Sequence, residues 1–163
     1  ATGRILSTET LNVREDDAVL VITNRGVKPN GDVINDTTTY RRVSGGPSLE
    51  GTWSRTSVNI GSPLIIEFEQ TAEDRLIFRQ PAWAVVCEAG LDGQDYPCTT
   101  PLGPGWTATM VKADTHELRM VVKKDARPFV IMTFQASEDG CTLTQVSETN
   151  GSSEKTTIVY ERQ

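Results

Sequence analysis

The chain has 163 residues, 37% of them hydrophobic, and its formal net charge of -6 accompanies a sequence pI near 4.8. Its basic residues are scattered, whereas a protein that binds nucleic acid needs clustered lysines and arginines to displace counterions from the phosphates. No run approaches the ~18 consecutive apolar residues of a membrane helix. We therefore expect no nucleic-acid partner and no membrane insertion.

Alternation of apolar and polar side chains predicts antiparallel β-strands along most of the chain. The first clear run, 18–23 (AVLVIT), is rich in residues that favour strands. The runs 64–70 and 118–123 each place three apolar side chains on one face and mainly charged side chains on the other. The run 129–135 is apolar on both faces for much of its length, which is typical of a strand buried on both sides.

Turn signals separate these runs at short intervals. Asx-Gly pairs favour the left-handed backbone angles of tight hairpin turns, and glycine–proline clusters interrupt the chain elsewhere. About a dozen strand candidates result, and strands this closely spaced indicate an all-β barrel or sandwich. The hairpin pairs are Asn30-Gly31, Asp92-Gly93, Asp139-Gly140 and Asn150-Gly151.

Two parts of the sequence repeat the same order of features. Residues 15–43 and residues 138–163 both begin with an acidic turn, continue with a β-rich run and an Asn-Gly turn, and end in a strand that carries Tyr-x-Arg. Any two hairpins share some of these features, but the matched order of all four favours an internal duplication. Residues 1–43 are then extra closing strands that echo 132–163.

The segment Leu-Glu-Gly-Thr-Trp at 49–53 resembles the Gly-x-Trp opening of lipocalins and related calycin barrels. The motifs at 92–97, 139–144 and 159–163 are similar to segments of small exported bacterial lipocalin-like proteins. The resemblance implies an all-β, antiparallel, up-and-down β-barrel of about 8–10 strands, with 51–163 as the lipocalin-like unit and 1–163 as one domain. The chain departs from the family because we find no long C-terminal helix and no Thr-Asp-Tyr motif.

Few residues suit catalysis or metal binding. His116 is the only histidine and follows turn residues, so a three-histidine metal site within one chain is excluded. Glu67 shares a strand face with Glu69, and an inward-facing pair of this kind could do acid–base chemistry, but solvent exposure is the commoner arrangement. Cys87 and Cys98 flank a turn-rich loop, and both a bridge and free thiols remain open. We expect no metal and no cofactor.

Aromatic and methionine side chains point instead to an apolar pocket. Trp106 shares a face with Met110, and the next predicted strand offers Met120. Such soft side chains suit an apolar cavity, although they suit a filled core equally well. The full set of predicted ligand-binding residues is Trp83, Trp106, Met110, Met120, Phe68, Arg79 and Tyr96, with Arg79 and Tyr96 as polar groups that orient the ligand.

The sequence therefore predicts a protein that binds a small apolar molecule inside the barrel. Two alternatives remain open: a barrel enzyme, such as a cyclase or isomerase that uses Glu67, and a structural or interaction module from a repeated array. Because the sequence begins with Ala1 rather than Met, we expect a mature secreted or periplasmic protein. Oligomers could form through the N-terminal strands, whose exposed edges invite pairing.

Overall fold

The computed structural model describes residues 7–15, 17–28, 30–61, 64–71, 74–152 and 155–163. Every strand pair among them is antiparallel, and the only helix is a single 3-10 turn, which confirms the all-β antiparallel class. Within the same ranges, no helix has the length and apolarity needed to cross a membrane. The contacts group the chain into two compact units, 1–65 and 66–163.

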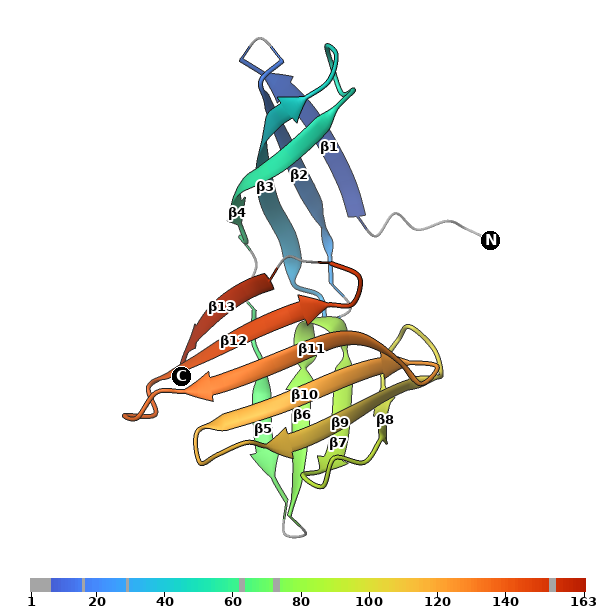
Figure 1. Ribbon diagram of the computed structural model, residues 1–163, viewed down its shortest axis with the longest axis vertical. Helices are drawn as coiled ribbons and strands as arrows, with labels where there is room; N and C mark the ends of the chain where they lie inside the picture. Colours follow the sequence, from blue (N-terminus) through green and yellow to red (C-terminus); the bar gives the residue numbers. More distant parts are fainter. Residues whose placement is uncertain (1–6, 16, 29, 62–63, 72–73, 153–154) are drawn as a thin grey trace. The chain divides into compact units, whose positions relative to one another are not determined.

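The first unit is a single four-stranded sheet in the order β1-β2-β3-β4. Most side chains of β1 and β4 are exposed, and full burial is confined to β2 and β3 and the turn after β2. Successive strands are joined by short turns, as in a meander (Figure 1). The strands are β1 (Ser7–Arg14), β2 (Val19–Val27), β3 (Val33–Ser44) and β4 (Thr52–Asn59).

The second unit is a nine-stranded sheet in which every strand pairs with its neighbours in sequence, from β5 to β13. The sheet curls into a half-barrel: β5–β8 form one layer, and β9–β13 cross in front of it (Figure 1). This is the up-and-down topology that the sequence predicts. The strands are β5 (Glu67–Gln70), β6 (Arg75–Gln80), β7 (Val85–Gly90), β8 (Tyr96–Thr99), β9 (Trp106–Lys112), β10 (Glu117–Lys124), β11 (Arg127–Ala136), β12 (Thr142–Thr149) and β13 (Lys155–Glu161).

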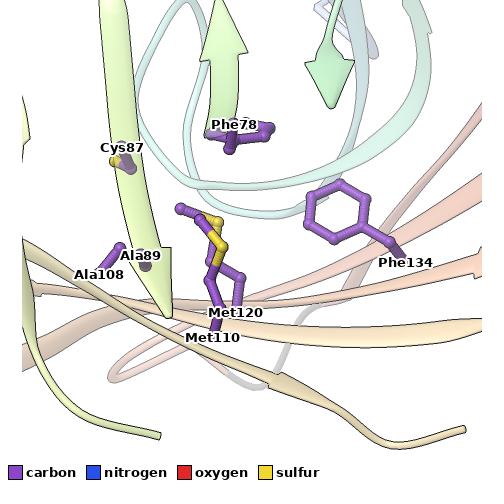
Figure 2. Close-up of a cluster of buried hydrophobic side chains, with 7 residues drawn as sticks. All are labelled: Phe78, Cys87, Ala89, Ala108, Met110, Met120 and Phe134. Carbon is purple, nitrogen blue, oxygen red and sulfur yellow. The ribbon is translucent and has the colours of Figure 1, made fainter. Parts of the chain in front are cut away.

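The core of the second unit lies between these two layers. Phe134 on β11 meets the rings of Phe68 and Phe78, with centroids 5.0 and 5.9 Å away. Met110 and Met120 are directly opposite each other on β9 and β10 and point toward these rings (Figure 2). Because strand side chains alternate between faces, the inward set of each strand meets the other layer. The buried cluster comprises Phe78, Cys87, Ala89, Ala108, Met110, Met120 and Phe134.

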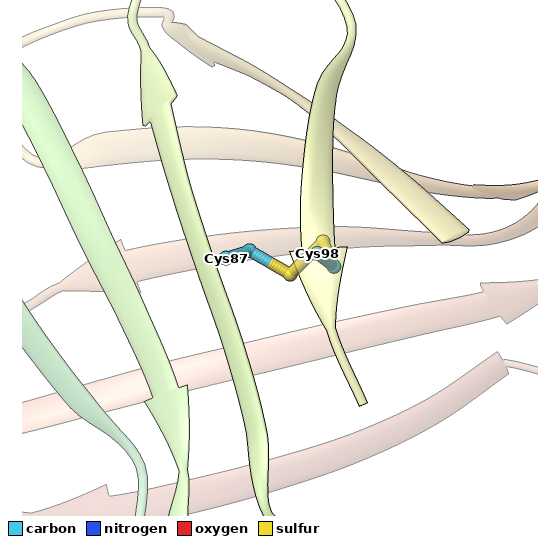
Figure 3. The surroundings of a disulfide bond; sticks show 2 residues. All are labelled: Cys87 and Cys98. Carbon is cyan, nitrogen blue, oxygen red and sulfur yellow. A yellow bond between two sulfur atoms is a disulfide. The ribbon is translucent and has the colours of Figure 1, made fainter. Parts of the chain in front are cut away.

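A disulfide joins Cys87 on β7 to Cys98 on β8, which resolves the alternative left open by the sequence (Figure 3). The two residues are a cross-strand pair with Cα atoms 4.4 Å apart, close enough for a bridge. Cys141 remains an exposed free thiol.

The boundary between the two units differs from the one that the resemblance implied. The Gly-x-Trp strand β4 pairs with β3 and belongs to the first unit, whereas the resemblance placed it at the start of a unit covering 51–163. The reason is local: the guanidinium of Arg42 stacks on the ring of Trp53 at 4.1 Å, and Trp53 Nε1 donates to the Leu49 carbonyl. These contacts bind the loop and β4 to β3.

Candidate functional site

The second unit carries a cleft of about 230 Å³ at one end of its two layers. Its floor comes from both layers: β5 and β6 supply Phe68 and Leu76, and β10 and β11 supply Leu118 and Phe134. Leu91 and Leu143 complete the apolar surface. The inward faces of these strands also form the core of the second unit. The cleft therefore continues the core as an apolar space that no described side chain fills.

The mouth of the cleft is polar and is formed largely by the turn between β9 and β10. One carboxylate oxygen of Asp114 accepts hydrogen bonds from the backbone N–H groups of His116 and Glu117, both at 2.7 Å. Thr115 Oγ1 lies 3.1 Å from Nδ1 of His116. The backbone of this turn is therefore fixed by its own aspartate, and Lys112 and Gln70 complete the rim.

The cleft combines an apolar floor with a polar rim. Aromatic and leucine side chains offer an apolar surface, and the rim offers hydroxyl, imidazole, carboxylate and ammonium groups that can orient one polar end of a ligand. No group of three or more His, Cys, Asp or Glu side chains that could hold a metal ion occurs within the described ranges.

Only Phe68 of the seven predicted ligand-binding residues lines the cleft. Met110 and Met120 have no exposed surface and fill the core, as the filled-core interpretation required. Trp106 lies on β9 but packs edge-on against Phe129, with centroids 5.2 Å apart, and Lys124 Nζ lies 5.6 Å from its ring centre. Trp106 and Met110 therefore share a face of β9, as the sequence predicts. That face packs against other side chains of the protein.

The other three predicted residues lie elsewhere in the second unit. Trp83 lies in the 3-10 turn Pro81–Trp83, which the proline starts and the left-handed Ala84 ends, and it is 42% exposed. Arg79 is on the outer face of β6, where it forms an ion pair of 2.7 Å with Glu69. Tyr96 donates its hydroxyl proton to Asp92 at 2.9 Å.

The glutamate proposed for the enzyme alternative faces solvent. Glu67 is exposed on β5, next to the half-buried Phe68, as alternation along the strand requires. His116, which the sequence places after turn residues, is exposed and also borders the cleft. Sequence reasoning missed the site because it followed tryptophans and methionines, whereas the leucines and the β9–β10 turn that form the cleft carry no distinctive pattern.

A separate polar cluster surrounds Tyr96 and the connection between β7 and β8. Hydrogen bonds from the Gln94 backbone and from the Tyr96 hydroxyl lower the pKa of Asp92, and the Asp92 carboxylate raises the pKa of Tyr96. Hydrogen bonds from Lys123 and Thr109 lower the pKa of Asp95. These contacts tie the loop at 92–95 to the outer face of the sheet.

Comparisons of the chain with protein-family models, with curated proteins and with solved structures found no match.

Proposed function

We propose that the second unit binds a small apolar molecule in the cleft between its two layers. The observation that carries this proposal is the cleft itself, with an apolar floor and a rim of hydrogen-bonding groups. A cavity of about 150 Å³ is known to hold benzene. A volume near 230 Å³ therefore suits a ligand somewhat larger, such as a substituted aromatic ring or a short acyl chain.

A neutral fluorescent probe tests this proposal directly. N-phenyl-1-naphthylamine, which brightens in apolar surroundings, should bind to the folded protein saturably, at one molecule per chain. Ala136 is a small residue that lines the cleft from β11. The substitution Ala136→Phe fills the space with a ring and should abolish binding. Absence of saturable binding to the folded protein would overturn the proposal.

The control substitution is at Gln135, the residue before Ala136 on β11. Gln135 is exposed on the opposite face of β11, so Gln135→Phe adds the same ring outside the cleft and should leave binding unchanged. Gln70→Trp narrows the mouth from an exposed position and weakens binding without disturbing the core. Equal loss of binding in the Gln135 variant would show that the probe does not use the cleft.

We also propose that the half-barrel is of lipocalin type and that the protein is exported. The up-and-down order of β5–β13 and the apolar cleft between its layers support the first point. The Cys87–Cys98 bridge supports the second, because disulfides persist in oxidising compartments. Alkylation of the protein taken from its host, followed by mass analysis, should find Cys141 modified and Cys87 and Cys98 protected. Modification of all three would contradict export.

A further inference from the structure

Two hairpins of the protein, β2–β3 and β12–β13, share one hydrogen-bonding geometry. In the first, the backbone N–H of Arg42 donates to the Ala18 carbonyl at 2.9 Å, and in the second the backbone N–H of Arg162 donates to the Cys141 carbonyl at 2.9 Å. Two residues further in, each hairpin places a leucine opposite a tyrosine. These pairs are Leu20 with Tyr40 and Leu143 with Tyr160. The sequence echo is therefore a structural repeat in register, in which Arg162 occupies the position of Arg42.

The two arginines also lie near equivalent turns. Arg42 Nε donates to the carbonyl of Asp17, the residue before Ala18, at 2.6 Å. Arg162 lies beside Gly140, the residue before Cys141: a Cβ built on that glycine would lie 3.8 Å from Arg162 Nη1. Both guanidinium groups thus lie against the turn that begins their hairpin.

In the first unit, Arg42 holds a further strand in place. Its guanidinium donates to the carbonyls of Gly46, Ser48 and Glu50 and stacks on Trp53. The three carbonyls belong to the loop before β4, and Trp53 lies at the start of β4. The strand then pairs with β3 from Thr52 to Asn59. The outer edge of β3 is therefore covered by a strand that opens with Gly-Thr-Trp.

The equivalent edge in the second unit is the outer edge of β13. β13 is the last strand of its sheet, and no strand in the described part of the chain is hydrogen-bonded to its outer edge. The Arg162 guanidinium is exposed and has no hydrogen bond or ion pair with any described residue. An open edge with unpaired N–H and C=O groups accepts an added strand.

We propose that the outer edge of β13 binds an extended peptide strand of the Gly-x-Trp type, with the tryptophan stacked on Arg162. Transferring the register of β3 and β4 places Trp53 of such a strand opposite Arg162, and Val58 opposite Ile158 where the first unit has Thr38. The second unit thus offers a more apolar partner for Val58. The occupant is a segment of another polypeptide that has the pattern of residues 45–59, since residues 52–59 of this chain are already paired with β3.

A labelled peptide with the sequence of residues 45–59 tests the proposal by fluorescence anisotropy against the full chain at submicromolar concentration. Binding should saturate at one site, and Arg162→Ala should weaken it by about tenfold or more, since both the stacking and the carbonyl contacts are lost. A peptide with Trp53→Ala should bind equally weakly. Arg119→Ala is the matched control, because Arg119 is an exposed arginine within the same sheet, on β10.

Three results would overturn the proposal. The first is no saturable binding of the peptide to the folded chain, and the second is equal affinity for the parent protein and the Arg162→Ala variant. The third is self-association of the chain that persists in Arg162→Ala, since a second copy would then cover the edge by different contacts. Arg42→Ala should leave peptide binding intact, which distinguishes the β13 edge from exchange of the peptide with β4.

Discussion

The two units build sheets from similar hairpins but stabilise them differently. The nine-stranded sheet curls so that one half covers the other, and Phe134, Met110 and Met120 lose almost all contact with water. The four-stranded sheet has no second layer of its own within the described ranges, and its outer strands β1 and β4 stay exposed. The comparison shows that a core requires enough strands to fold a sheet onto itself, whereas a single-layered sheet depends on edge contacts such as those of Arg42.

The largest expected effect is in the core of the second unit. Phe134→Ala removes a ring that touches both layers and should cost about 3–5 kcal/mol in the free energy of unfolding. Urea denaturation followed by tryptophan fluorescence measures this loss. Phe129→Ala is the matched control on the same strand: Phe129 is 50% exposed, so its loss should be less than half as large. Equal losses would show that the two layers do not bury Phe134.

The disulfide should have the next largest effect. The bridge closes a short loop, with a sequence separation of 11, and a loop of that size restricts the unfolded chain by about 2–3 kcal/mol. Reduction should therefore lower the unfolding midpoint of the second unit. The Cys141→Ser variant should respond to reductant in the same way, because Cys141 takes no part in the bridge. A midpoint that is unchanged by reductant would contradict a bridged folded state.

The stability of the four-stranded sheet should depend on Arg42 and not on its neighbour Arg41. Arg42→Ala should destabilise the first unit by about 1–2 kcal/mol and free the amides of β4 to exchange with solvent. Arg42→Lys should not restore protection, because an ammonium cannot donate to several carbonyls and stack at once. Arg41→Ala on the opposite face, and Arg162→Ala in the second unit, should leave this exchange unchanged. Hydrogen exchange measured by mass spectrometry distinguishes these outcomes.

The smallest effect concerns the polar cluster on the outer face of the second unit. Because Lys123 and Thr109 lower the pKa of Asp95 in the folded state, this carboxylate contributes stability above its unfolded pKa of 3.8. That contribution is lost as the pH falls through the lower folded value. In Lys123→Met the pKa of Asp95 should rise toward 3.8, as carbon-detected NMR titration would show. An unchanged pKa would mean that the ion pair does not form in solution.

The fold was predictable because its signals are local. Alternation identified the inward faces of β5 and β10, and Asx-Gly pairs marked turns such as those at Asn30 and Asp139 correctly. The position of β4 was not predictable from its Gly-x-Trp motif, because the contacts that hold β4 to β3 involve Arg42, which lies outside the motif. The cleft was not predictable either, since Leu91 and Leu143 come together only when the sheet curls.

The loop that encircles Arg42 depends on two glycines. A Cβ on Gly45 would lie 2.2 Å from the Gly51 Cα atom, and a Cβ on Gly51 would lie 2.2 Å from the Ser44 carbonyl oxygen, so neither position admits a side chain. Gly51 also has a φ of +128°, which disfavours other residues. The sequence pattern that identifies this arginine-binding loop is therefore Arg-x2-Gly-x5-Gly-x-Trp, from Arg42 to Trp53. A search for that spacing should retrieve distant relatives that the shorter Gly-x-Trp pattern would lose among chance matches.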